Sequence, residues 1–383
     1  MRAPRRPRTG RVLAGTLPAA ALIVAAIIFA VVQVGASRGF DEALSAFSSA
    51  RNTTDAGGTS LRAEADQSAA IATASSTILA ADAGDALPAD ARDALASTGS
   101  ALQKSVEQAR AAVPDASPSA PRKPFWAWEL GAGTDRLRSM RADAEEQGRS
   151  IETARTALDA ATTAASGAGT AALSAAAGTA SGIEQANISA RTGDVIALRN
   201  AAKALSDRAT ALSQWSADAF TAYEAAIVKI RASNEAELAE KAGPLYDARL
   251  QVEAYARSIA GGVLLDFDWA PIVNGYGDNG SAGGLTDWSS GEGTDPEGYS
   301  TITLSNSVAE MWPNDVSRAL VTHEVGHSIS SKCWSMFDWQ SRDANEAWAT
   351  AWALSWGQTA DGNGVSIYGY PPQSLIDTAA TCR

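Results

Sequence analysis

The sequence predicts a mostly α-helical protein in three parts: an N-terminal transmembrane helix, a long alanine-rich helical hairpin or coiled-coil stalk, and a small α+β domain at the C-terminus. A long stretch without charge near the N-terminus indicates the first part. A seven-residue repeat of apolar and small residues indicates the second part. Alternating β-branched residues, followed by a segment with a helix-capping signal, indicate the third part.

The N-terminal segment predicts a membrane anchor. Residues 1–16 contain five arginines and no acid, and residues 12–37 contain no charged residue. About 20 apolar residues span a bilayer, so residues 17–36 fit a transmembrane helix. Because arginine-rich flanks stay in the cytoplasm, residues 37–383 would lie outside the cell. A signal peptide cleaved at residues 34–36 is the alternative, but the apolar run exceeds the usual length of about 7–15 residues for such a signal.

Residues 37–260 predict an extracellular helical region with a proline-rich break at residues 113–124. We also expect interruptions near Gly57–Gly58 and Pro88, and a weak zone at residues 167–182. Alanine-rich seams bury little area, so an elongated hairpin or bundle is expected rather than a large core. Two interleaved series repeat every seven residues, the spacing of a coiled-coil seam: Val195, Ala202, Ala209, Ser216, Tyr223 and Ile230, and Leu198, Leu205, Leu212, Ala219 and Ala226.

This helical region could serve as a stalk, self-associate or bind a partner protein. A partly disordered alanine-rich spacer is the alternative. The net charge of −12 argues against nucleic acid as a partner. Five arginines already belong to the tail that we place in the cytoplasm, so the exported part is more acidic still.

Both histidines of the chain lie in one pentapeptide, HEVGH at residues 323–327. Positions i and i+4 share one face of a helix, so the two imidazoles can reach one metal ion. Asn314 or Asp315 can begin this helix as its N-cap residue. Gly326 costs about 1 kcal/mol in a helix relative to alanine, which suggests that another backbone packs closely there. This spacing is the His-Glu-x-x-His arrangement of zinc peptidases, and a surface helix with two solvated histidines is the alternative.

A catalytic zinc site has three protein ligands and one open position. No histidine remains for the third, so it must be a carboxylate or a thiolate. Glu346 is the first candidate, because the 18 residues after His327 allow the helix to end and a second helix to begin antiparallel. Ala349 and Ala353 share its helical face and would let the two helices approach closely. The alternative for Glu346 is a capping box with Asp343 as N-cap residue.

Cys333 is the second candidate for the third ligand. It stands where the longer metzincin pattern has its third histidine, but Ser330 replaces the glycine that should end the helix. The only other cysteine is Cys382, and two cysteines in an exported domain are most simply explained as a disulfide. The sequence therefore favours Glu346 as ligand.

These motifs resemble those of the gluzincins, the thermolysin-like clan of zinc metallopeptidases. The pentapeptide at residues 323–327 matches the first motif of that family, and Asn-Glu-Ala at residues 345–347 matches the motif that carries the third ligand. The resemblance covers only these short motifs within residues 261–383, for which it implies a small zincin-like domain. It implies Zn²⁺ ligands and a general base as follows: His323, His327 and Glu346 bind the metal, and Glu324 is the base.

The chain departs from the family at two positions. The aspartate that usually follows the ligand glutamate by four residues, and that orients the first histidine, is replaced by Thr350, whose hydroxyl could accept the same N–H. The later histidine that stabilises the oxyanion has no counterpart. Candidates to replace it are Tyr368, Tyr370 and Arg342.

Residues 263–267 and 299–305 predict strands. In the resembled family an edge strand before the zinc helix pairs with extended substrate; an ordinary core strand is the alternative for residues 299–305. Residues 275–298 are crowded with Gly, Asp, Asn and Ser and predict a long loop, whose carboxylates could bind calcium.

Together these inferences predict a single-pass cell-membrane protein with an extracellular zinc metallopeptidase domain at residues 261–383. It would hydrolyse a peptide or protein substrate, with Glu324 as general base. The alternative is a non-catalytic cell-surface interaction protein with a helical stalk and a zinc-stabilised or degenerate peptidase module.

Overall fold

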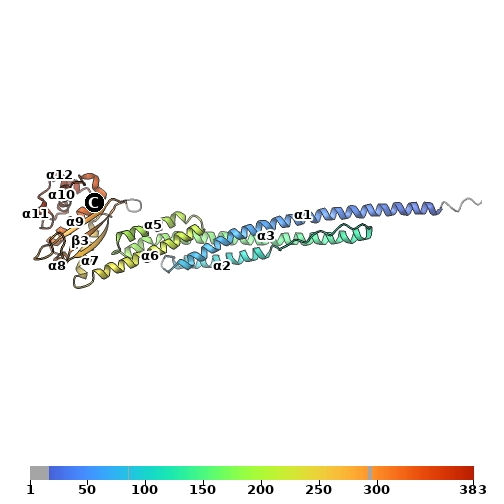
Figure 1. The fold of residues 1–383 in the computed structure, drawn as a ribbon, viewed down its shortest axis with the longest axis horizontal. Coiled ribbons are helices and arrows are strands. Elements are labelled where there is room, and N and C mark those ends of the chain that lie inside the picture. The colour runs from blue at the N-terminus through green and yellow to red at the C-terminus, as the bar shows by residue number, and fades with distance from the viewer. Residues whose placement is uncertain (1–16, 85, 292–295) are drawn as a thin grey trace, which may run out of the picture. The chain divides into compact units, whose positions relative to one another are not determined.

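The computed structural model is mostly helical and contains one three-stranded sheet (Figure 1). It divides into two compact units. The first contains the described residues up to Ser76 together with Ala94–Ala168, and the second contains Thr77–Asp93 and Gly169–Arg383. The residues that the structure describes are 17–84, 86–291 and 296–383.

The first unit is a bundle formed by parts of three helices, α1 (Leu17–Ala81), α2 (Ala89–Ala111) and α3 (Ala127–Gly178). Its interior is made of isolated large side chains separated by alanines, as expected for a seam that permits close approach. Four polar contacts and ion pairs hold neighbouring helices together: Thr54 with Ala144, Glu64 with Arg155, Asp66 with Arg110, and Ser68 with Thr162. The contacts of α3 advance along α1 from Ala144 to Thr162, so α3 runs parallel to α1. Arg110 of α2 pairs with Asp66 whereas Gly99 lies against Ser75, so α2 runs antiparallel to α1. The buried core comprises Leu61, Ala65, Leu102, Val106, Ala109, Val113, Ile151, Leu158 and Ala165.

The N-terminal end of α1 is long and apolar enough to cross a membrane. Its large side chains, from Leu22 to Val34, are about half exposed or more on every side of the helix. A helix that is hydrophobic all round and unburied by protein matches a lipid environment better than water. The described residues thus contain one apolar N-terminal helix that fits a membrane anchor or a signal sequence.

Glycines in α1 mark close packing and not a break. The helix continues through Gly57–Gly58, so the expected interruption there is wrong. A Cβ atom on Gly58 would lie 2.8 Å from Cγ1 of Val113, which shows that the glycine makes room for a neighbouring side chain. The interruption expected at Pro88 is confirmed, because α1 ends at Ala81 and α2 begins at Ala89.

The proline-rich break is confirmed as a non-helical connection between α2 and α3. It follows α1 back toward the N-terminal end of that helix. Ser117 hydrogen-bonds Asp55, Lys123 Nζ lies 2.6 Å from Asp41 Oδ1, and Gln33 Nε2 donates to the carbonyl of Phe125 at 2.5 Å. We call residues 113–126 the strap.

The helices of the second unit before the sheet are α4 (Ala180–Ala186), α5 (Thr192–Arg208), α6 (Gln214–Glu240) and α7 (Tyr246–Ile259). The weak zone is confined to Thr179 and the short α4, because α3 continues to Gly178. All positions of the seven-residue repeat are buried. The chain nevertheless turns between α5 and α6, so the repeat lines a helical hairpin and is not one continuous seam.

The sheet has the order β1-β3-β2, with β1 (Leu264–Ala270) parallel and β2 (Gly284–Ser289) antiparallel to β3 (Tyr299–Ser305). Residues 299–305 therefore form the central strand, and the expectation that they form the edge is wrong. One of the two edge strands, β2, lies inside the segment expected to be a loop. Its pattern was obscured because it is short and is flanked by glycine, asparagine and serine.

Six short elements follow or cover the sheet: α8 (Asn306–Met311), α9 (Asp315–Cys333), the 3₁₀ turn η1 (Trp334–Met336), α10 (Arg342–Ser355), α11 (Val365–Tyr368) and α12 (Gln373–Ala379). Their core contains the fully buried Trp348 and Trp352 of α10. It also contains Val252, Ala256 and Ile259 of α7, so this core begins upstream of residue 261.

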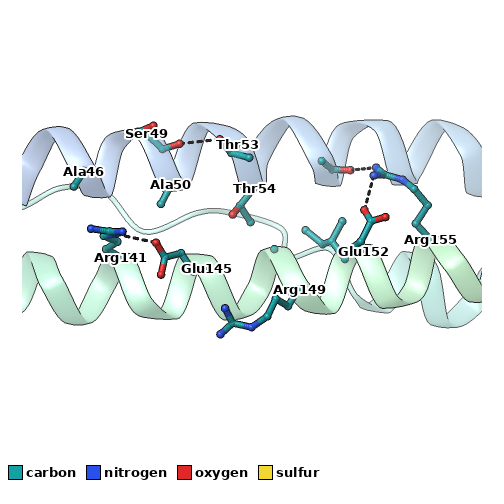
Figure 2. A pocket seen from close by; sticks show the side chains of 13 residues that line it. Ala46, Ser49, Ala50, Thr53, Thr54, Arg141, Glu145, Arg149, Glu152 and Arg155 are labelled. Carbon is teal, nitrogen blue, oxygen red and sulfur yellow. Dashed lines mark hydrogen bonds and ion pairs between the residues drawn. The ribbon is translucent and has the colours of Figure 1, made fainter.

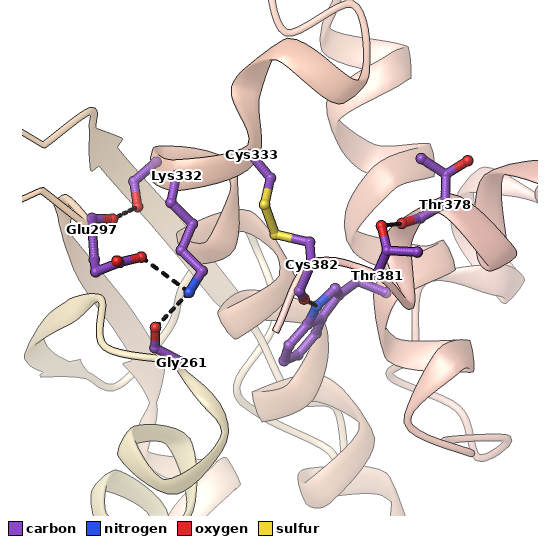
Figure 3. Close-up of a disulfide and its surroundings, with 9 residues drawn as sticks. Gly261, Glu297, Lys332, Cys333, Thr378, Thr381 and Cys382 are labelled. Atoms are coloured by element: carbon purple, nitrogen blue, oxygen red, sulfur yellow. Dashed lines mark hydrogen bonds and ion pairs between the residues drawn. A yellow bond between two sulfur atoms is a disulfide. The ribbon is translucent and has the colours of Figure 1, made fainter.

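The two cysteines lie at disulfide distance, as expected (Figure 3). Cys333 ends α9 and Cys382 follows α12, so the bond connects the end of the histidine helix to the C-terminal segment. The indole of Trp352 donates to the carbonyl of Cys382 at 3.0 Å. Beside it, Lys332 contacts Glu297 at 3.1 Å and the carbonyl of Gly261 at 2.5 Å. These contacts hold α9 against both the strand connections and the C-terminus.

Candidate metal centre

The helix α9 presents both histidines on one face. Asn314 is its N-cap residue, and its Oδ1 accepts a hydrogen bond from Ser317 N at 2.8 Å. One turn apart, the rings of His323 and His327 lie 4.9 Å from each other. His323 is 4% exposed. The alternative of two solvated surface histidines is therefore wrong.

The helix α10 brings Glu346 to the histidines. Its N-cap residue is Ser341, whose hydroxyl accepts from Ala344 N. Asp343 therefore lies inside the helix, and the capping-box alternative for Glu346 is wrong. A Cβ atom on Gly326 would lie 2.9 Å from both Cα and O of Ala349, so the glycine and the small alanine allow the two backbones to touch.

Three side chains converge on one point. Glu346 Oε2 lies 3.4 Å from His323 Nε2 and 3.2 Å from His327 Nε2. The three ligand atoms lie within 4.8 Å of one another, and the described residues contain one such group of histidine, cysteine and acidic side chains. Two imidazole nitrogens and one carboxylate form the donor set of many catalytic zinc sites, so the chemistry of these residues fits a divalent cation. Cys333 is occupied by its disulfide partner and is not part of this group.

The first histidine is oriented by a backbone carbonyl. His323 Nδ1 lies 3.2 Å from the carbonyl oxygen of Asn363, so an Nδ1–H donates there and fixes the ring with Nε2 directed toward Glu346. The Thr350 hydroxyl, suggested from the sequence for this role, has no hydrogen-bond partner although it is buried. Gly364 has φ +93°, and a Cβ atom there would lie 2.3 Å from Thr350 Oγ1 and 2.7 Å from His323 Cε1. Only glycine fits this loop against the imidazole.

The histidines also determine the charge of Glu346. Burial raises the pKa of this carboxyl, but hydrogen bonds from His323 and His327 outweigh burial and hold the pKa far below its ordinary value. The carboxylate is therefore ionised at neutral pH. An ionised carboxylate is the form that binds a metal ion.

Glu324 lies beside the three ligands and is 4% exposed. Its Oε2 accepts a hydrogen bond from the Thr286 hydroxyl at 2.7 Å, which connects it to β2. A Cβ atom on Gly284 would lie 2.3 Å from Glu324 Oε1, so the strand has no side chain where the carboxylate sits. Burial raises the pKa of Glu324, although His323 and Thr286 oppose this effect.

Of the three candidates for stabilising an oxyanion, Tyr368 reaches the site. Its ring stacks on His323 with centroids 5.9 Å apart, and its hydroxyl interacts with the carboxylate of Glu346. Burial and the nearby Glu346 raise the pKa of Tyr368 to about 12, so the hydroxyl stays protonated. Arg342 interacts electrostatically with Tyr368, whereas Tyr370 is 68% exposed.

A cavity lined by tryptophans adjoins Glu324. It has a volume of about 550 Å³ and includes Thr286, Trp288, Trp334 and Trp339. The rings of Trp288 and Trp339 meet edge to face with centroids 6.2 Å apart. Sequence reasoning missed this cavity, since its residues come from β2, η1 and the turn before α10. Exposed clusters of large aromatic side chains are typical of binding sites.

A second cavity lies between α1 and α3 in the first unit and has a volume of about 690 Å³ (Figure 2). Each arginine that lines it has an acidic partner in its own helix. Arg141 contacts Glu145, Arg149 contacts Glu146 and Arg155 contacts Glu152. This groove therefore has no uncompensated charge that would select a ligand.

The acidic loop gives no support to a calcium site. Glu292 and Asp295 lie outside the described residues. Glu297 is paired with Lys332 at 3.1 Å.

Comparison of the chain with protein-family models, with curated proteins and with solved structures finds no match. The function must therefore be argued from the geometry of this centre.

Proposed function

We propose that this chain is a membrane-anchored, zinc-dependent metallopeptidase of gluzincin type. The observation that carries the proposal is the convergence of His323 Nε2, His327 Nε2 and a Glu346 oxygen within 4.8 Å, with Glu324 buried beside them. A structural zinc site needs four closed ligands, whereas three ligands and an adjacent base are the arrangement of a catalytic site. The N-terminal apolar helix would hold the C-terminal domain outside the cell.

The side chains have separate tasks in peptide hydrolysis. Zinc bound by His323, His327 and Glu346 would supply Lewis acidity and lower the pKa of a water molecule toward about 7. Glu324 accepts a proton from the attacking water and delivers it to the leaving amine. Burial raises the pKa of Glu324, which makes its carboxylate a stronger proton acceptor. Tyr368, protonated and stacked on His323, donates to the oxyanion that forms at the scissile carbonyl.

The substrate would lie along β2 and reach the tryptophan-lined cavity. β2 is an edge strand of the sheet, and Thr286 on it contacts Glu324 and lines the cavity. An extended peptide can pair with such an edge while a side chain enters an adjoining pocket. Trp288, Trp334 and Trp339 would bind a large apolar or aromatic side chain of that peptide.

Metal content and peptide cleavage of the full chain in detergent test this proposal. We expect one zinc per chain both in the wild type and in Glu324→Gln. Of these two proteins, only the wild type should cleave a peptide library. Zinc should be lost in Glu346→Ala and retained in Cys333→Ser. Cleavage that persists in Glu324→Gln would exclude the peptidase mechanism. Zinc binding without any cleavage in the wild type would instead support the non-catalytic interaction protein.

A further inference from the structure

An aromatic cluster lies beside the apolar end of α1. Phe125, Trp126 and Trp128 are 75%, 42% and 65% exposed. The indoles of Trp126 and Trp128 stack with centroids 5.1 Å apart, and Phe125 meets Trp126 edge to face at 4.9 Å. Three large aromatic rings that contact one another in water indicate a surface that another apolar phase covers.

The position of this cluster along α1 is fixed by specific contacts. Gln33 Nε2 donates to the carbonyl of Phe125 at 2.5 Å. Two turns further along, Phe40 packs with Leu130 in a small core. Lys123 and Asp41 form an ion pair at 2.6 Å. The aromatic cluster therefore lies between the level of Gln33 and that of Phe40, where the apolar segment gives way to the first charged residues.

The strap is stretched to reach this level. Val113 packs against Gly58, and Phe125 lies at Gln33, so the strap passes 25 helical residues of α1. At about 1.5 Å per residue this distance is about 38 Å. Twelve residues of extended, proline-rich chain cover about 37–40 Å. A shorter connection could have joined α2 to α3 near Val113, so the length of the strap serves to carry the aromatic cluster to the end of the apolar helix.

The helix itself gives the location of the membrane boundary. Residues 17–36 extend about 30 Å, which matches the thickness of a hydrocarbon core. Their outer end lies at Ala36, and Arg38 is the first charged residue beyond it. Gln33 and the aromatic cluster thus fall where the hydrocarbon meets the headgroups, the level at which tryptophan is enriched in membrane proteins.

From these observations we infer that Phe125, Trp126 and Trp128 insert into the outer headgroup region of the same bilayer that the N-terminal helix spans. They bind lipid as an aromatic girdle contributed by α3 beside the anchor. The anchor and α3 then meet the membrane together, which restricts the tilt of the bundle relative to the bilayer. This inference rests on the membrane anchor of the proposed function but not on the peptidase activity.

The test uses the full chain reconstituted in phosphatidylcholine vesicles whose lipids carry bromine either near the headgroups or near the bilayer centre. We expect bromine near the headgroups to quench part of the tryptophan fluorescence, and bromine at the centre to quench it less. In W126F/W128F the quenchable part should fall nearly to zero. The matched control is W215F, because Trp215 is similarly exposed at 73% but belongs to the second unit. That variant should retain the wild-type quenching.

An equal quenched fraction in the wild type and in W126F/W128F would overturn the inference. So would an absence of quenching in vesicles that carry the chain. If that absence were accompanied by crosslinking between two copies through a cysteine placed at residue 125, the cluster would be a protein interface instead. If the chain did not float with vesicles at all, the anchor would be wrong and this inference would fall with it. Zinc binding and cleavage, measured in detergent, would remain as a separate result.

Discussion

The helical bundle of the first unit and the α/β part of the second place their charged groups in opposite environments. In the bundle, the acids and arginines form exposed ion pairs, such as Arg110 with Asp66, whose side chains are 52% and 72% exposed. Around the candidate metal centre, Glu324 is 4% exposed, and Glu346 contacts both histidines. Water screens the first kind of pair, whereas the second kind strongly changes the protonation of its members.

This difference is the reason why we propose a reactive site in the second unit and none in the bundle. The bundle has a cavity of about 690 Å³, larger than the one beside Glu324, yet its charges are compensated within each helix. The centre in the second unit has ligand groups that converge and a buried base. We therefore place the proposed chemistry by the convergence of polar groups and not by cavity size.

The largest expected contrast compares a buried with an exposed glutamate. Glu324→Gln should lower the rate of peptide cleavage by about 10²–10⁴-fold, because it removes the proton acceptor and keeps the shape of the side chain. Glu152→Gln in the bundle groove should leave the rate unchanged. Initial rates on one peptide, with zinc content measured in each sample, compare the two. Similar rates for both variants would contradict the assignment of Glu324.

The second contrast compares the disulfide of the second unit with an exposed ion pair of the bundle. Cys333→Ser with Cys382→Ser opens a loop of 49 residues and should lower the free energy of unfolding of the second unit by about 4 kcal/mol. Arg110→Ala in the bundle removes an exposed ion pair and should cost less than about 1 kcal/mol. Denaturant unfolding followed by circular dichroism measures both. A loss below 1 kcal/mol in the cysteine variant would show that α9 does not depend on this bond.

The third prediction separates two neighbouring tyrosines. Tyr368→Phe should lower kcat/KM by about 10²-fold with zinc affinity retained, because it removes one donor to the oxyanion. Tyr370→Phe should have no effect, since that side chain is exposed and away from the ligands. The pKa of Tyr368 is raised to about 12, so its hydroxyl should stay protonated up to pH ~11 and its deprotonation should not cause a fall in rate below that pH. A Tyr368→Phe variant with the wild-type kcat/KM would exclude it from catalysis.

The smallest expected effects come from two glycine-to-alanine substitutions, which should change the free energy of unfolding in opposite directions. Gly326→Ala should destabilise the second unit by about 1–3 kcal/mol, because the added Cβ would lie 2.9 Å from the backbone of Ala349. Gly167→Ala in α3 should stabilise its helix by up to about 1 kcal/mol, since nothing lies within 4 Å of a Cβ there. Thermal unfolding measures both signs. Equal shifts of the melting temperature in the two variants would mean that α9 and α10 are not in backbone contact.

Local patterns were sufficient for much of the fold. The absence of charge predicts the apolar anchor segment, and Pro88 predicts the break in the helices. A capping residue predicts the helix start at Asn314. The presence of only two cysteines in the chain predicts that they pair. The i and i+4 spacing of His323 and His327 places them on one face because that spacing is a property of the helix itself. The prediction of an interruption at Gly57–Gly58 is wrong, because glycine also permits close packing. Whether a side chain packs there depends on residues far away in the sequence.

The sequence by itself determined which side chains are the candidates for binding a metal ion, since two histidines and an adjacent glutamate leave few arrangements. Only the tertiary structure decided what surrounds them. The carbonyl of Asn363, the placement of β2 at the sheet edge, the tryptophan cavity and the position of Tyr368 depend on contacts between segments far apart in the chain. Such contacts result from packing around a shared core, and periodicity along one segment carries no information about them.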